Sequence, residues 1–237
     1  MVEFEVAVGR VASFGRLAKP WESAFCGVLK WYSVFYEIPG GFVFSEGASM
    51  IPLELLLSAY KQGVFPMAEP GGEISWFSPD PRGILPLEEF YLPHGLKRAL
   101  KKGLFEIRIN TAFEAVLEGC ANRPETWIDA RIKASYTALY HLGLAHSVEA
   151  WVDGALGGGL YGVSLGGVFF GESMFHTVTD ASKVALVALV ERMRARGMGL
   201  LDLQWVTPHL LKFGAREVPR RVYLKLLSEQ LDQPCGF

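Results

Sequence analysis

The stretch Ser147–Phe175 of this 237-residue chain, SVEAWVDGALGGGLYGVSLGGVFFGESMF, decides the fold. Two turn dipeptides, Asp153-Gly154 and Gly166-Gly167, separate three apolar runs. The runs are 148–152, 156–164 and 168–175. Turn dipeptides of this kind between apolar runs are typical of hairpins, because they tolerate the left-handed backbone of tight turns. The stretch therefore predicts an antiparallel meander of three strands.

A helix and one more strand are predicted after the meander. Residues 181–196 carry apolar side chains at helical spacing, and Gly197 follows them as an end signal. A strand at 200–206, a short helix at 208–213 and a final helix at 220–231 come next. This order of elements is that of the acyl-CoA N-acyltransferase-like (GNAT-like) fold, which is an analogy of fold alone.

The first half of the chain mixes predicted helices and strands. Proline and glycine crowd the segment 65–82, so we expect a structured loop there, with neither regular helix nor central strand. The other predicted elements are helices at 52–62, 94–102, 111–121 and 129–142 and a strand at 105–109. The fold class is therefore predicted to be α+β. We expect a smaller mixed α/β N-terminal domain at 50–110 and a GNAT-like catalytic C-terminal domain at 111–237.

Composition narrows the setting in which the protein works. The three cysteines are far apart and show no zinc-ligand spacing, so we expect no metal site and a reducing, cytoplasmic location. The N-terminus lacks a basic leader, and charges, a proline and glycines interrupt its apolar stretch at 25–44. These features argue against a signal peptide or a spanning helix, so we expect no membrane partner.

Basic side chains gather in two places, although the net charge is only −2. Residues 191–225 hold eight basic and three acidic side chains, and Lys97, Arg98, Lys101 and Lys102 form a smaller cluster. Such clusters are usually solvated helix faces, but they also suit a phosphate backbone. The sequence therefore permits a polyanionic partner.

Two carboxylates interrupt segments of core-type residues. Glu172 follows the apolar run 168–170, and Asp202 follows Leu200 and Leu201. Desolvation of an unpartnered carboxylate costs on the order of several kcal/mol, so acids in such positions are candidates for a functional site. Taken singly, each is more often a structural acid with a hydrogen-bond or ion-pair partner at a strand end.

Ordered short motifs run from about Pro52 to the last helix. They are YKQGVFP at 60–66, WFSPDPR at 76–82, TWI at 126–128, AHSVE at 145–149, GGLYGV at 158–163, GESMF at 171–175, ASK at 181–183, LDLQ at 201–204 and HLLKFGA at 209–215. In these motifs the chain resembles the leucyl/phenylalanyl-tRNA–protein transferases, bacterial aminoacyltransferases that create N-degrons. The resemblance implies transfer of Leu, Phe or Met from an aminoacyl-tRNA to the α-amine of a protein that begins with Arg or Lys.

The resemblance also implies catalytic roles. The donor is already an activated ester, so no ATP, metal or other cofactor is expected, and the enzyme must hold the ester, deprotonate the amine and stabilise an oxyanion. Asp202, with Gln204 on the same side of its strand, resembles an acid proposed to relay the amine proton. Glu172 resembles an acid that binds the positive N-terminus of the acceptor or orients the site. Whether Asp202 is a base or a positioning group stays open.

Substrate-binding residues are implied in the same way. Aromatic rings are expected to stack on the terminal adenosine, and an apolar pocket is expected to take the side chain of the donor amino acid. For each residue alone, an ordinary place in the core is the competing interpretation. The implied residues are Trp76, Phe77, Trp127, Tyr136, Leu160, Phe169, Ser173, Leu189 and Met193. His146 lies beside no nucleophile motif, so we expect it to be a structural hydrogen-bonding residue.

Two other functions stay open. An acetyl-CoA-dependent N-acetyltransferase would share the fold, but residues 176–183 contain no glycine and carry an acid where pyrophosphate would bind. A non-catalytic RNA-binding module would leave Glu172, Asp202 and Gln204 unexplained. Residues 1–49 lie outside the resemblance and are either a real subdomain or an upstream stretch from an early start codon. We expect the protein to be a monomer.

Overall fold

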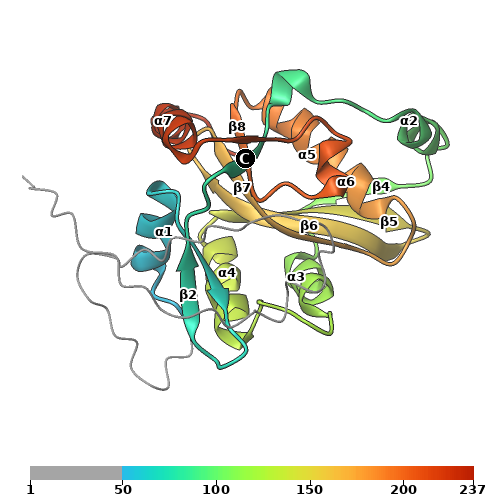
Figure 1. Ribbon diagram of the computed structural model, residues 1–237. Helices are drawn as coiled ribbons and strands as arrows, with labels where there is room; N and C mark the ends of the chain where they lie inside the picture. Colours follow the sequence, from blue (N-terminus) through green and yellow to red (C-terminus); the bar gives the residue numbers. More distant parts are fainter. Residues whose placement is uncertain (1–49) are drawn as a thin grey trace, which may run out of the picture. The chain divides into compact units, whose positions relative to one another are not determined.

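The computed structural model describes residues 50–237, and the structural statements below concern these residues (Figure 1). The predicted extension at 1–49 lies outside them. In chain order the elements are α1 (Leu53–Lys61), β1 (Phe65–Ala68), β2 (Ile74–Phe77), β3 (Arg82–Leu85), the 3-10 helix η2 (Leu87–Glu89), α2 (His94–Lys101), β4 (Glu106–Ile109), α3 (Phe113–Ala121), α4 (Ala130–His141), β5 (Ala145–Val152), β6 (Ala155–Leu165), β7 (Val168–His176), α5 (Ala181–Ala195), β8 (Leu200–Gln204), α6 (Pro208–Leu211), β9 (Arg216–Val218) and α7 (Arg220–Leu231).

Seven strands form one mixed sheet in the order β4-β5-β6-β7-β8-β3-β9. Neighbouring strands are antiparallel except for β7 and β8, which run parallel because α5 connects them. The strands β1 and β2 form a separate antiparallel hairpin, in which Phe65 lies opposite Phe77. The protein is therefore of the α+β class, as predicted.

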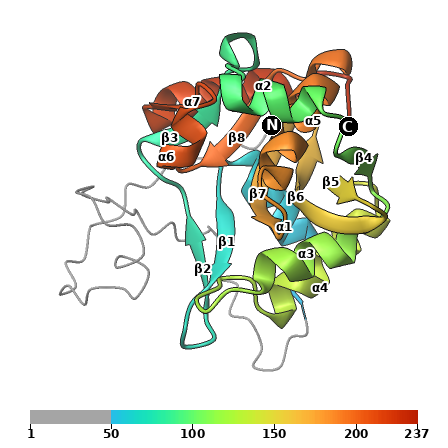
Figure 2. The same ribbon diagram turned by 90° about the vertical axis from the view of Figure 1, so that its right-hand side faces the viewer.

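Helices pack on both faces of the large sheet (Figures 1 and 2). The helix α5 contacts β5, β6 and β7. On the opposite face of the sheet, α3 contacts the same three strands and α4 contacts β5. Successive strand residues point to opposite faces, so Leu160 and Tyr161 of β6 enter different core clusters. Phe169 and Phe170 of β7 divide in the same way. The sheet therefore separates two hydrophobic cores.

The predicted meander is confirmed. Strands β5, β6 and β7 pair antiparallel, and the two predicted turns connect them. The helices predicted at 52–62, 94–102, 111–121, 129–142, 181–196, 208–213 and 220–231 are present with small shifts at their ends. Apolar periodicity was a sufficient signal for these elements because each buries one face locally.

The prediction of a loop at 65–82 is wrong in part. A hairpin occupies most of this segment, and Arg82 begins β3, which lies between β8 and β9 in the large sheet. Pro66 is tolerated because its strand belongs to a two-stranded hairpin with one unpaired edge. The sequence analysis also missed β9, which is three residues long, and β8 ends at Gln204 instead of residue 206.

The large sheet crosses the predicted domain boundary at residue 110. Strands β3 and β4 precede that boundary, but they pair with strands β8, β9 and β5, which follow it. The division into domains at 50–110 and 111–237 stays a prediction. Among residues 50–237, no helix combines the length and apolar character needed to cross a lipid bilayer.

Candidate active site

The separation of β7 from β8 brings the two predicted catalytic acids together. The strands pair from Val168 and Leu200 to Phe170 and Asp202, where their pairing ends. Farther along, β7 stays beside β6 and β8 stays beside β3. Glu172 lies on β7 just past the last pair, and Asp202 belongs to that pair. Both carboxylates therefore lie where the sheet opens between these two strands.

Asp202 is completely buried and its carboxylate is saturated with donors. The Nε of Arg82 donates to Oδ1 at 2.9 Å, and Nη2 of Arg82 donates to Oδ2 at 2.6 Å. The backbone N–H of Gln204 donates to Oδ1 at 2.9 Å, and the hydroxyl of Tyr223 donates to Oδ2 at 2.7 Å. A carboxylate has about four lone-pair sites, so these four donors occupy all of them.

Arg82 ties Asp202 to two other parts of the chain. Its Nη1 donates to the carbonyl oxygen of Gly63 at 2.9 Å, and its guanidinium lies over the rings of Phe65 and Tyr223 at 4.9 and 4.5 Å. Burial is the largest single influence on the pKa of Arg82 and lowers it. The charge and hydrogen bond of Asp202, with smaller contributions from Tyr223 and Glu172, together raise the pKa above its ordinary value. The two side chains form a buried ion pair, and we call Arg82, Asp202 and Tyr223 the arginine clamp.

Gly63 is required by the geometry of this clamp. Its φ of +73° lies in the left-handed region, which glycine adopts without strain. A Cβ at this position would lie 2.7 Å from the ring of Tyr223. The turn after α1 can therefore bring its carbonyl to Arg82 only because residue 63 has no side chain.

Glu172 has quite different partners. The hydroxyl of Tyr60 on α1 donates to Oε1 at 2.7 Å, and the hydroxyl of Tyr136 on α4 donates to Oε2 at 3.1 Å. The two hydroxyl oxygens also contact each other. The side-chain amide of Gln204 approaches Oε1 at 3.5 Å, which is a weak contact. We call Tyr60, Tyr136 and Glu172 the phenol cluster.

The pKa values in the phenol cluster reflect burial without a neighbouring cation. Burial and, to a smaller extent, the carboxylate of Asp202 raise the pKa of Glu172, while the hydrogen bonds from Tyr60 and Tyr136 and the charge of Arg82 oppose the rise. The net result is a pKa of about 7 instead of 4.5. Burial and the charge of Glu172 raise the pKa of both phenols well above 10.0. Near neutral pH, Glu172 therefore exists in both protonation states while both phenols keep their protons.

Gln204 connects the two carboxylates. Its backbone N–H binds Asp202, and its side-chain amide points toward Glu172. Its φ of +56° is left-handed, which is uncommon for a residue other than glycine. The sequence analysis placed Gln204 on the face of Asp202 by strand alternation. The turned backbone at the end of β8 positions it instead.

The predicted adenosine-stacking residues differ in exposure. Trp76 on β2 and Trp127 before α4 are partly exposed, and the carbonyl of Trp127 accepts a hydrogen bond from the backbone of Ala68 at the end of β1. Phe77 is 5% exposed and packs against Phe65 and Trp205 at 6.1 Å each. Stacking by the two tryptophans stays a prediction. Phe77 offers a substrate no exposed ring face in this structure.

Ser173 and the predicted donor-pocket residues differ in their surroundings. The hydroxyl of Ser173, next to Glu172 on β7, accepts a hydrogen bond from Nη2 of Arg123 at 3.2 Å. The predicted pocket residues share one buried cluster between the sheet and α5, and each is at most 3% exposed. They are Leu160, Phe169, Leu189 and Met193. The structure groups these residues, but it packs them as core, so their role as a pocket stays a prediction.

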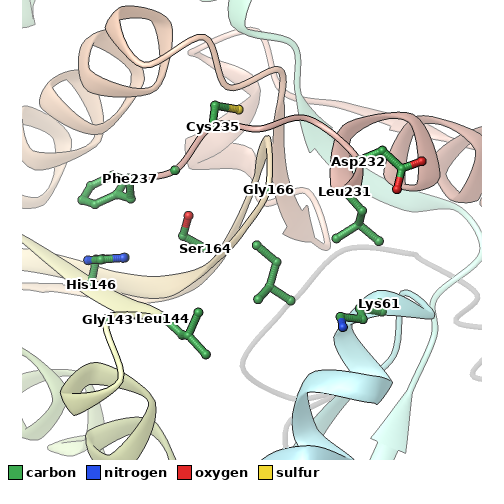
Figure 3. Close-up of a pocket in the computed structure, with 12 residues that line it drawn as sticks. Lys61, Gly143, Leu144, His146, Ser164, Gly166, Leu231, Asp232, Cys235 and Phe237 are labelled. Atoms are coloured by element: carbon green, nitrogen blue, oxygen red, sulfur yellow. The ribbon is translucent and has the colours of Figure 1, made fainter.

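A cavity of about 590 Å³ lies away from the two acids, near the end of the chain (Figure 3). The buried side chain of His146 lines it, with Nδ1 at 2.9 Å from the side-chain nitrogen of Asn110. Burial and then the charge of Arg192 lower the pKa of His146 to about 4, so its ring is neutral near pH 7. The ring of Phe237 lies 4.6 Å from it. The hydrogen bond agrees with the predicted structural role of His146.

Three site residues were missed by the sequence analysis as individual participants: Arg82, Tyr60 and Tyr223. Arg82 could have been found from the sequence, because it directly precedes the apolar residues 83–85 and was therefore a candidate for burial. A buried arginine needs an acidic partner. Tyr60 and Tyr223 occupy apolar positions of helices, where an aromatic residue is usually core. Among residues 50–237, no group of His, Cys, Asp and Glu side chains is arranged to hold a metal ion.

Comparison with known proteins gives the same family over most of the chain. The family model for leucyl/phenylalanyl-tRNA protein transferase matches residues 84–228, and the model for its N-terminal domain matches residues 50–80. A leucyl/phenylalanyl-tRNA–protein transferase of Akkermansia muciniphila is 58% identical over 185 residues, which are 76% of this chain and 96% of the relative. The corresponding protein of Gloeobacter violaceus is 54% identical over 78% of this chain and 96% of the relative.

Solved structures are much more distant. The structure of L-PGS from Bacillus licheniformis shares 10% sequence identity, with a TM-score of 0.37 over 63% of this chain and 49% of that one. A likeness of this size supports no conclusion about function.

Proposed function

Because this chain belongs to the leucyl/phenylalanyl-tRNA–protein transferase family and is an aminoacyltransferase, we propose how its site performs the transfer. The donors are leucyl- and phenylalanyl-tRNA, with methionyl-tRNA as a further donor. The acceptors are proteins that begin with Arg or Lys, and the product carries a new N-terminal residue that forms an N-degron. The match of residues 50–80 and 84–228 to the two family models carries this proposal.

The chemistry fits a site with two carboxylates and no metal requirement. The amine of the acceptor attacks the carbonyl carbon of the aminoacyl ester, a peptide bond forms, and the ester bond to the ribose oxygen of the tRNA breaks. The ester is already activated, so positioning and charge stabilisation supply the catalysis. Glu172 is suited to attract the positively charged N-terminus of the acceptor, because its carboxylate is held by neutral groups only.

The clamp supports a positioning role for Asp202. Its four acceptor sites are filled, so the predicted relay of a proton through Asp202 would require Arg82 or Tyr223 to release it. Gln204, held by Asp202 and directed at Glu172, is the residue through which the clamp acts on the site. We therefore assign Asp202 and Gln204 to positioning, and Glu172 to contact with the acceptor.

Helix α2 supports the binding of the tRNA. Its basic residues Lys97, Arg98 and Lys101 and the following Lys102 are all exposed, and the first turn contains no acid. Such a surface attracts a phosphate backbone, and binding should weaken steeply with salt. We further propose a GNAT-like arrangement of the sheet, with the donor at the opening between β7 and β8. The protein is proposed to act in the cytoplasm as a monomer.

The proposal is tested by incubating the purified protein with radiolabelled phenylalanyl- or leucyl-tRNA and a peptide that begins with Arg. Label is expected on this peptide, and not on a matched peptide that begins with Asp. A parallel reaction with labelled acetyl-CoA is expected to give no product. Transfer from acetyl-CoA alone would show that the reaction has been assigned wrongly. Asp202→Asn tests its role, because retention of activity to within about tenfold, roughly 1.4 kcal/mol, would exclude it as the base.

A further inference from the structure

The phenol cluster has one hydrogen too few for its contacts when Glu172 is ionised. Three oxygen-to-oxygen contacts join the two phenols and the carboxylate. Each tyrosine has one hydroxyl hydrogen, and an ionised carboxylate has none. Two hydrogens therefore serve three contacts. Addition of one proton to Glu172 would supply the third, so that every contact in the ring becomes a hydrogen bond.

We propose that the phenol cluster takes up the proton that the acceptor ammonium must lose before it attacks the aminoacyl ester. This inference rests on the proposed function, because it assigns a step of that reaction to named atoms. Glu172 touches the acceptor and is the catalytic group. Tyr60 and Tyr136 are positioning residues that hold its carboxylate and share the added proton.

The contrast with Asp202 supports this assignment. Asp202 is surrounded by four donors, and one of them, Arg82, carries a full positive charge. A proton placed on Asp202 would meet this cation and displace a donor. Glu172 has one close donor on each oxygen, so each oxygen keeps a free lone pair. Glu172 is also partly exposed, whereas Asp202 is completely buried.

Groups from five elements surround Glu172. Tyr60 from α1 and Tyr136 from α4 donate to it, and Gln204 from β8 approaches it. The charges of Asp202 on β8 and Arg82 on β3 act on it with opposite signs. Burial raises the pKa of the Tyr161 phenol on β6 well above 10.0, so this phenol carries no charge near neutral pH. Burial dominates and raises the pKa of Glu172 to about 7, close to the pH at which a proton acceptor works best.

The step balances in atoms and charge. The acceptor ammonium transfers one proton to the carboxylate of Glu172 and becomes an amine. The amine forms the bond to the carbonyl carbon, and its second proton goes to the ribose oxygen of the tRNA as the ester bond breaks. Glu172 then releases its proton to solvent. The net reaction consumes an ester and an ammonium and yields an amide, a ribose hydroxyl and one proton.

The test is the pH profile of kcat/KM for an Arg peptide, with labelled phenylalanyl-tRNA as donor and correction for spontaneous ester hydrolysis. The wild type is expected to gain activity with an inflection near pH 7 and then to level off. Glu172→Gln can use only acceptors that have already lost their proton. Its inflection should therefore move to the pKa of a peptide amine, roughly 8, and its activity at pH 7 should fall about tenfold, because only about one acceptor in ten is unprotonated there.

Two further variants separate the proton role from simple packing. Tyr136→Phe keeps the ring but removes a donor to Glu172, so its inflection should lie above that of the wild type. Tyr161→Phe is the matched control, because the Tyr161 hydroxyl is buried and has no hydrogen-bond partner among residues 50–237. The rings of Tyr161 and Tyr136 lie 5.5 Å apart. Tyr161→Phe should keep the wild-type inflection.

The outcomes distinguish the two levels of the proposal. If the wild type labels no peptide at any pH, the proposed function fails. If the wild type is active and Glu172→Gln keeps the same inflection with activity within about threefold, only the proton role of Glu172 fails. An inflection that moves equally in Tyr161→Phe and Tyr136→Phe would also overturn the inference, because it would point to general disturbance of the core.

Discussion

The arginine clamp and the phenol cluster both hold a carboxylate at the opening between β7 and β8, but they leave it in opposite states. Asp202 receives two hydrogen bonds from a buried guanidinium, and one each from a phenol and a backbone amide. Glu172 receives close hydrogen bonds from two neutral phenols. A full cation compensates the desolvation of an anion, whereas neutral donors compensate only part of it. Asp202 is therefore held in a buried ion pair, and Glu172 can change its charge near neutral pH.

The difference is the basis for the separate roles that we propose for the two acids. A saturated, ion-paired carboxylate is good at holding other groups in place, because each of its bonds would have to break before it could react. A carboxylate with free lone pairs and a pKa of about 7 can exchange a proton at neutral pH. The clamp therefore supplies rigidity, and the phenol cluster supplies a proton acceptor.

The largest expected effect comes from breaking the clamp. Arg82→Met leaves the buried carboxylate of Asp202 without its cation, so we expect a loss of roughly 3–5 kcal/mol in the free energy of unfolding. Urea denaturation at pH 7 measures this loss. The double variant Arg82→Met/Asp202→Leu removes both charges and should recover most of it. If the double variant is as unstable as the single variant, electrostatic pairing is not what makes Arg82 important.

A smaller effect is expected from the ionisation of Glu172, which makes the free energy of unfolding depend on pH. Its pKa is raised on folding, so between pH 4.5 and about 7 the folded state holds a proton that the unfolded state has lost. This contribution makes the protein less stable as pH rises through that window, by at most about 3 kcal/mol. Glu172→Gln should therefore gain stability relative to the wild type on going from pH 5 to pH 8, as measured by urea denaturation at several pH values.

His146 serves as a comparison for this measurement, because folding lowers its pKa whereas folding raises the pKa of Glu172. Its pKa is lowered to about 4 on folding, so the unfolded state binds a proton first as the pH falls below 6.5. The His146 contribution to stability is therefore lost as pH falls from 6.5 toward 4. His146→Asn should remove this acid-side loss and leave the Glu172 effect in place. A difference between wild type and Glu172→Gln that does not vary with pH would contradict the raised pKa of Glu172.

The smallest expected effect on stability concerns Tyr223, the neutral member of the arginine clamp. Tyr223→Phe removes one hydrogen bond of 2.7 Å to Asp202 and keeps the ring that lies against Arg82. Because the acceptor is charged, we expect a loss of about 2 kcal/mol in the free energy of unfolding. Urea denaturation at pH 7 measures it, with Tyr161→Phe as the matched control. Equal losses in the two variants would mean that the bond to Asp202 adds nothing beyond the phenol itself.

Local patterns predicted much of this fold. The meander and the helices appear where turn dipeptides and apolar spacing indicated them. The prediction failed for two short strands. The strand β3 begins directly after a proline-rich segment, and β9 is only three residues long. A strand this short has too little alternation to be recognised, and its place is set by pairing with β3.

The candidate site was predicted less completely. Glu172, Asp202 and Gln204 were selected from the sequence, and the structure brings all three together. Phe77 was expected to stack on the terminal adenosine, and the structure buries its ring against Phe65 and Trp205, so this role stays a prediction. Glu149 is a fully buried acid that was not selected as a site residue. Its hydrogen bonds to Thr111, Ala112, Ser147 and Trp151 account for it structurally.

The sequence by itself determined the three strands of the meander, the helices and the presence of two acids in buried-type segments, because these depend on residues close together in the chain. Only the tertiary structure decided which donors surround each of the two carboxylates. Arg82 meets Asp202 across 120 positions, and Tyr60 meets Glu172 across 112. The charge state of a buried carboxylate depends on which donors surround it, and donors that come from distant segments are assembled only by the folded sheet and its helices.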